Sequence, residues 1–305
     1  MDVKALSLDD RQALEELDAR LKTILPENYQ ESYEDVQPVP MRSAGLKYGA
    51  DGRVAWNEIW ASFCDLAMAG GPPHKGTLLE AGRPEAIEAH PHRYAEIVEE
   101  ICRGVMMTAL LDAVPAPNPG WIRVTCLSEG MAGWLLRAIV MENVAARLDG
   151  VALDLPAAPH FRLEKEIKNV VTVIAKTTHY WLEHMPRSQQ RAITGLFARL
   201  AVESPLVEPA SAHDEADTAA MAAAIEPETS LRSSAHRYTG WLGVQCPSVR
   251  RAIWMMRALV AGNVLSRREE TVLFVPINPA LDPGGRAVVE AVLRVDRLAR
   301  AKDVR

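Results

Sequence analysis

Residues 120–159 read GWIRVTCLSEGMAGWLLRAIVMENVAARLDGVALDLPAAP, and residues 240–279 read GWLGVQCPSVRRAIWMMRALVAGNVLSRREETVLFVPINP. The two stretches align without a gap at a constant offset of 120 residues and share 16 identities in 40 positions. Two unrelated stretches of this length share far fewer. The chain is therefore predicted to contain two copies of one supersecondary unit.

The local pattern within each copy predicts a strand followed by a helix. The segments WIRVTC and WLGVQC alternate and are rich in aromatic and branched residues, as short strands are. Ser128 and Ser248 follow them and suit the N-caps of helices. Asn143 and Asn263 suit the helix ends, because Asn tolerates a left-handed backbone. Each helix between these residues is apolar on two faces, which predicts that it is covered on two sides.

A hairpin and a second helix complete each copy. Asp149-Gly150 lies between two alternating runs in the first copy, which favours a hairpin. The second copy has Glu269-Glu270 at that place, which predicts a different turn. The resulting order β-α-β-β-α predicts an α+β protein of tandem ferredoxin-like units. A fourth strand is not evident after either copy, so it is absent or supplied by the partner copy or by the N-terminal region.

The rest of the chain is arranged around the two copies. Residues 6–25 have helical spacing, and residues 26–40 contain three prolines and resemble a connector. Between them and the first copy, a strand, a helix over about 55–69, a second strand and a second helix echo the repeat and suggest a diverged third unit. The predicted division is 1–40 for the N-terminal helix and connector, 41–119 for an N-terminal α/β unit, 120–186 for the first copy, 187–238 for a helical and acidic connector, and 239–305 for the second copy.

Composition excludes several classes of protein. The net charge of −6 and the isoelectric point of about 5.8 lack the basic footprint of a nucleic-acid-binding protein. No apolar run is long enough to span a bilayer, so no membrane association is expected. The N-terminus lacks the apolar core of a signal peptide. The four cysteines are widely spaced and without a C-x-x-C pair, which predicts reduced thiols and a cytoplasmic protein.

Cys126 and Cys246 are the candidate catalytic residues. Each ends a predicted strand two residues before a helix N-cap, where the helix dipole and free amides would stabilise a thiolate and lower the pKa. The alternative is that both are small buried apolar residues. Cys246-Pro247 is similar to the Cys-Pro at a helix start in small sulfur-carrier proteins, although Leu127 follows Cys126. Heavy-metal-associated domains carry cysteines in a comparable loop, but as a Cys-x-x-Cys pair, and the chain is assigned to neither family.

Five further residues are candidates for ligand binding. His74 and Lys75 lie in the stretch GGPPHKG (70–76), whose glycines and prolines predict a rigid turn that presents them. Arg137 and Arg257 lie mid-helix, three residues after a Trp in each copy, where an Arg binds an anion or stacks on the indole. His179 stands beside Tyr180-Trp181 and would line a pocket or edge the core.

Other histidines give weaker signals. His184 follows His179 at a spacing of five, so the two are expected to point in different directions on a helix. His90 and His92 flank a proline without the spacing of a known metal motif, so no metal ligand is assigned.

Three functions remain open from the sequence alone. The first is a small-molecule- or cofactor-binding protein, an accessory factor in a biosynthetic pathway, with its ligand between the copies or against the His74 loop. The second is a thiolate-dependent enzyme or a sulfur or metal carrier that uses Cys126 or Cys246. The third is a structural or assembly module, with the two-sided helices buried in a homo-oligomer. No motif identifies a cofactor or a reaction.

Overall fold

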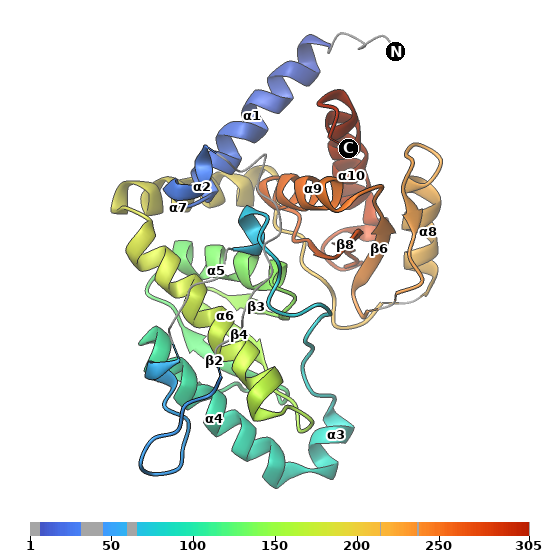
Figure 1. The fold of residues 1–305 in the computed structure, drawn as a ribbon. Coiled ribbons are helices and arrows are strands. Elements are labelled where there is room, and N and C mark those ends of the chain that lie inside the picture. Colours follow the sequence, from blue (N-terminus) through green and yellow to red (C-terminus); the bar gives the residue numbers. More distant parts are fainter. Residues whose placement is uncertain (1–6, 32–44, 60–65, 214, 237, 305) are drawn as a thin grey trace. The chain divides into compact units, whose positions relative to one another are not determined.

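The computed structural model describes residues 7–31, 45–59, 66–213, 215–236 and 238–304 (Figure 1). The chain packs into two compact units, each with its own four-stranded antiparallel sheet and helices. Unit A is Pro38–Thr194 and contains the first copy; unit B is Met1–Gln37 together with Gly195–Arg305 and contains the second. The predicted α+β class is therefore confirmed.

Unit A has the strand order β1-β2-β4-β3, and each neighbouring pair is antiparallel. Its strands are β1 (Ala113–Pro115), β2 (Trp121–Thr125), β3 (Arg147–Asp149) and β4 (Ala152–Pro156). Its helices are α3 (Pro84–Ala89), α4 (Pro91–Ala109), α5 (Glu129–Met141) and α6 (Lys168–His179). Short 3-10 turns occupy Trp56–Glu58 and Ala67–Ala69, and π-helical turns occupy Leu163–Ile167 and Tyr180–His184.

Unit B has the matching strand order β5-β6-β8-β7. Its strands are β5 (Arg232–Ser233), β6 (Trp241–Gln245), β7 (Arg267–Glu269) and β8 (Val272–Pro276). Its helices are α1 (Leu8–Ile24), α2 (Glu27–Gln30), α8 (Glu215–Ile225), α9 (Val249–Ala261) and α10 (Arg286–Ala301), with a 3-10 turn at Pro283–Gly285. Helix α7 (Arg187–Glu203) contains the boundary between the two units.

Helices α5 and α9 begin and end with the same residues in the two units. Ser128 accepts a hydrogen bond from the backbone N–H of the residue three positions on, and Ser248 does the same. Asn143 and Asn263 have φ values of 60° and 67° in the left-handed region. Both pairs of capping predictions are confirmed. Every residue from Gly130 to Met141 is buried, as predicted for a helix covered on two sides.

The two hairpin turns are alike, so the prediction of a different turn in the second copy is wrong. Gly150 has a φ of 60°, and Glu270 has a φ of 50° at the equivalent position. Asp149 pairs with Ala152 in one hairpin, and Glu269 pairs with Val272 in the other. The paired strands fix the same register, and Glu270 therefore adopts a left-handed conformation that costs about 1–2 kcal/mol.

The fourth strand of each sheet comes from the residues that precede the copy. β1 pairs with β2 in unit A, and β5 pairs with β6 in unit B. A ferredoxin-like sheet has its fourth strand after the second helix, so the predicted ferredoxin-like topology is not confirmed by this order. An isolated parallel bridge outside the four strands also joins Leu79 to Val144.

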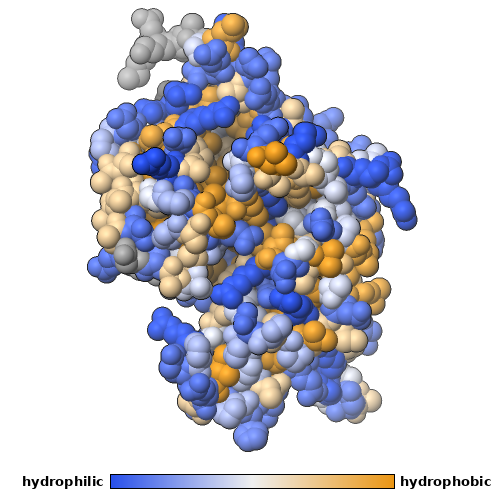
Figure 2. Space-filling model, turned by 180° about the vertical axis from the view of Figure 1, so that it is seen from behind, coloured by the Kyte–Doolittle hydropathy of each residue, from blue (hydrophilic) through white to orange (hydrophobic). Residues whose placement is uncertain are grey.

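Part of one predicted helix lies outside the described residues. The helix expected over about 55–69 includes residues 60–65, which are not described, and the described ends of this span are 3-10 turns. In the part of the chain that is described, no helix is both long and apolar enough to cross a bilayer. On the face drawn in Figure 2, groups of hydrophobic residues are interrupted by hydrophilic ones.

Candidate functional site

Cys126 and Cys246 are buried at the ends of β2 and β6. Their exposed fractions are 4% and 2%. Burial raises the pKa of both thiols to about 12, so the predicted lowering of their pKa values is wrong. The helix N-terminus would stabilise a thiolate, but these side chains are buried away from water. The free-energy cost of desolvating the thiolate outweighs that stabilisation and raises the pKa. Cys102 is also buried, and its pKa is raised to about 11, while Cys64 lies outside the described residues.

Arg137 and Arg257 are buried rather than displayed on the surface. Each is 3% exposed in the middle of α5 or α9. Nη1 of Arg137 donates a hydrogen bond of 2.7 Å to the carbonyl of Gly133 one turn earlier. Neither residue lines the cleft between α1, α9 and α10 or the one beside α4.

His179 and His184 contact each other, contrary to the prediction that they point apart. Their Nε2 atoms are 3.1 Å apart, and Nδ1 of His179 lies 3.2 Å from Glu183. The cause is the π-helical turn Tyr180–His184, whose wider period brings residues five apart onto one face. Among the described residues, no group of three or more His, Cys, Asp or Glu side chains is placed to hold a metal ion.

His74 and Lys75 lie against a buried ion pair that no sequence motif indicates. Glu142 follows the last turn of α5 and is 0% exposed. Its Oε1 accepts hydrogen bonds from Nζ of Lys176 at 2.6 Å and from the backbone N–H of Ala67 at 3.0 Å. Its Oε2 accepts one from the backbone N–H of His74 at 2.8 Å. Glu142 thus fixes the loop that carries His74 to the end of α5 and to α6.

The loop is attached at a second point through Lys75. Its carbonyl accepts a hydrogen bond of 2.9 Å from Nδ2 of Asn143, and its Nζ lies 3.5 Å from Oε1 of Glu166. Arg162 also pairs with Glu166, at 2.8 Å, and this hydrogen bond is the main reason that the pKa of Glu166 falls to about 2. We call His74, Lys75, Glu142, Glu166 and Lys176 the Glu142 cluster.

The charges of the Glu142 cluster are set by burial and by its neighbours. Burial lowers the pKa of His74 to about 4, and the nearby charge of Lys176 acts in the same direction. The imidazole is therefore neutral at pH 7 and can both donate and accept a hydrogen bond. Burial alone would raise the pKa of Glu142, but Lys176 and the hydrogen bonds outweigh it, and the pKa lies below its ordinary value. The carboxylate is therefore ionised.

Helix α6 carries further buried polar residues between two π-helical turns. Lys168, Thr177 and Thr178 are each less than 9% exposed, and burial lowers the pKa of Lys168. The hydroxyl of Thr178 has no hydrogen-bond partner among the described residues. π-Helical turns are rare and occur frequently at functional sites. The Glu142 cluster, which includes Lys176 of this helix, forms the candidate site.

Two features of the sequence mark this site. Glu142 is aligned with Gly262, so the first copy has a carboxylate where the second has no side chain. Lys168 and Lys176 bracket the apolar run NVVTVIA, where charged residues are unexpected on a buried helix.

The protonation of His74 should make unit A less stable in acid. The folded-state pKa of about 4 lies below the ordinary 6.5. The unfolded chain therefore binds the proton first, and stability is lost as the pH falls from 6.5 to 4. Between pH 7 and pH 4.5, the unfolding free energy should therefore fall by about 2 kcal/mol less in His74→Asn than in the wild-type protein. Urea unfolding at several pH values measures this. His92→Asn, at an exposed position on α4, is the control, and an unchanged slope in His74→Asn would contradict the assignment.

No protein-family model matches the chain, and neither a curated protein nor a solved structure is significantly similar to it.

Proposed function

We propose that the chain is a small-molecule- or cofactor-binding protein whose ligand binds beside the His74 loop and α6 in unit A. The observation that carries the proposal is the ion pair of Glu142 and Lys176, which is completely buried. Burying two charges costs several kcal/mol of desolvation each, and apolar residues often stabilise a fold as well or better. Perturbed titratable groups of this kind concentrate at functional sites.

The comparison between the two copies supports the same proposal. At the end of α9 in unit B, Gly262 takes the place of Glu142, and that end of the helix forms without an ion pair. Asn263 there donates to the carbonyl of Ser204 as Asn143 donates to that of Lys75. The helix end therefore does not need the charged cluster for folding. Neutral His74 provides a polar group for a ligand.

The proposal is tested by ligand screening of the full chain. The panel consists of nucleotides, flavins, folates and organic acids, tested by thermal shift, and native mass spectrometry of gently purified protein searches for a retained molecule. We expect a stabilising ligand whose melting shift is lost in His74→Asn and kept in His92→Asn. The proposal fails if no compound binds and none is retained, or if His74→Asn shows the full shift.

A ferredoxin-like arrangement in a circularly permuted form is also proposed for each unit. In that arrangement the edge strand and its helix follow the last central strand. In unit A, α4 and β1 would take these places although they precede β2, and α4 packs on both β1 and β2. The cytoplasmic location and the homo-oligomer stay predictions.

A further inference from the structure

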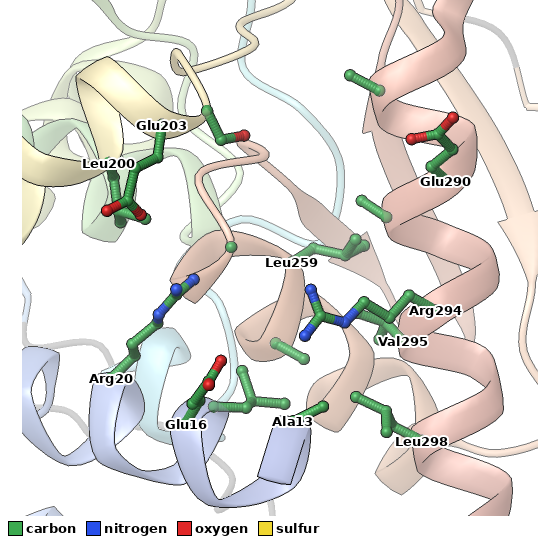
Figure 3. A pocket seen from close by; sticks show the side chains of 16 residues that line it. Ala13, Glu16, Arg20, Leu200, Glu203, Leu259, Glu290, Arg294, Val295 and Leu298 are labelled. Atoms are coloured by element: carbon green, nitrogen blue, oxygen red, sulfur yellow. The ribbon is translucent and has the colours of Figure 1, made fainter. Parts of the chain in front are cut away.

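Unit B contains a cavity that no sequence motif indicated. It has a volume of about 360 Å³ and lies between α1, α9, α10 and the last turn of α7 (Figure 3). Its apolar lining includes Leu17, Leu200, Leu259 and Leu298. Ligand cavities commonly have volumes of about 300–1,000 Å³ and mostly apolar walls with a few polar groups.

The cavity lies at a position where the two copies differ in sequence. Gly262 lines it at the end of α9, at the position that Glu142 occupies in the first copy. In unit A, Glu142 fills the corresponding helix end and pairs with Lys176 on the following helix. In unit B, the same place is open, and the following helix α10 contributes Arg294 to the wall.

Charged side chains of both signs line the cavity. Arg20 from α1 and Arg294 from α10 extend toward the same space from opposite walls (Figure 3). The carboxylates are those of Glu16, Glu203 and Glu290. Among the described residues, none of the five forms an ion pair; Glu16 accepts a hydrogen bond from Gln12.

Neighbours on the same two helices do form ion pairs. Asp10 on α1 pairs with Arg297 on α10 at 3.1 Å, and Asp296 pairs with Arg300 at 3.0 Å. On these helices Arg20 and Arg294 form no ion pair among the described residues and extend into the cavity. A cavity with an apolar floor and unpaired charges of both signs is complementary to a molecule with the same three features.

We propose that this cavity binds an apolar zwitterion, an amino acid or a dipeptide. Its carboxylate lies between the guanidinium groups of Arg20 and Arg294, which bind carboxylates through paired hydrogen bonds. Its ammonium group lies toward Glu16, and its side chains cover the leucines of the floor. The site is separate from the Glu142 cluster, and neither depends on the other.

Three related probes test the ligand class by titration calorimetry on the full chain. They are the dipeptide Leu-Phe, its N-acetyl derivative and its C-terminal amide. Leu-Phe should bind most tightly, and removing either charge should weaken binding about tenfold, as expected for a lost charge-assisted hydrogen bond. No saturable binding of Leu-Phe, or equal or tighter binding of either capped form, overturns the proposal.

Variants test the position of the ligand. Arg20→Gln and Arg294→Gln should each weaken Leu-Phe binding about tenfold or more. Arg11→Gln, at an exposed position on α1 outside the cavity, should leave it unchanged. Ala291→Phe should block binding by filling the cavity, and thermal unfolding without ligand shows whether each variant is folded. Unchanged affinity in folded Arg20→Gln and Arg294→Gln overturns the assignment. His74→Asn should bind Leu-Phe normally, because His74 belongs to the other site. A negative result for the cavity is therefore distinct from a negative result for the proposed function.

Discussion

Replacing Lys176 by methionine should lower the unfolding free energy of unit A by about 3–5 kcal/mol, because it leaves the carboxylate of Glu142 buried without its cation. The two side chains are 2% and 0% exposed, and their contact of 2.6 Å lies beyond the reach of solvent screening. Urea unfolding followed by tryptophan fluorescence measures the loss. Amide exchange then locates it in unit A, since two units need not unfold together.

Two further variants distinguish the effect of losing the ion pair from the effect of replacing a lysine side chain by methionine. Lys165→Met removes an exposed lysine just before α6 and should cost less than about 0.5 kcal/mol. The double variant Glu142→Gln with Lys176→Met should recover part of the loss, because it also removes the uncompensated charge. A cost for Lys176→Met as small as that for Lys165→Met would show that Glu142 is satisfied by its backbone donors alone.

In the native protein, Cys126 and Cys246 should react with iodoacetamide at pH 8 about a thousandfold more slowly than an ordinary thiol. Their pKa values lie near 12 instead of 9, and the thiolate is the nucleophile, so a shift of this size removes nearly all the reactive form. Site-resolved mass spectrometry over a time course gives the rate for each cysteine.

The unfolded chain is the control for both thiols. In urea, the two cysteines should react at the ordinary rate, and folding alone should account for the difference. Rapid labelling of either cysteine in the folded protein would restore the thiolate-dependent enzyme or carrier as the leading function. Slow labelling leaves both residues as packing groups at the strand ends.

Local signals in the sequence predicted the parts of the fold that neighbouring residues determine. Ser128 and Asn143 mark the ends of α5 because each satisfies backbone groups within one turn of itself. The strand of each copy followed from its alternation, and the covered helix followed from its two apolar faces. The turn at Glu270 was missed because the paired strands, and not the turn residues, decide its conformation.

The site depends on contacts between residues far apart in the chain, and these were less predictable. The pairing of Glu142 with Lys176 joins two helices, and no periodicity within either helix reveals it. The contact of His179 with His184 follows from a π-helical turn, which no residue of that stretch signals. His74 and Lys75 were identified, because glycines and prolines mark their loop, but the carboxylates that fix the loop were not.

The order of the strands has a consequence for how fast the protein reaches its native state. β1 and β2 form one hairpin and β3 and β4 another, so most pairings in the sheet join residues that are close in sequence. Among the pairings of the four named strands, only β2–β4 spans helix α5, and contacts at such separation are the ones that slow folding. The transition state of each sheet is therefore expected to form when α5 or α9 docks the two hairpins together. Core substitutions in these helices would then slow refolding, whereas changes in the hairpin turns would mainly speed unfolding.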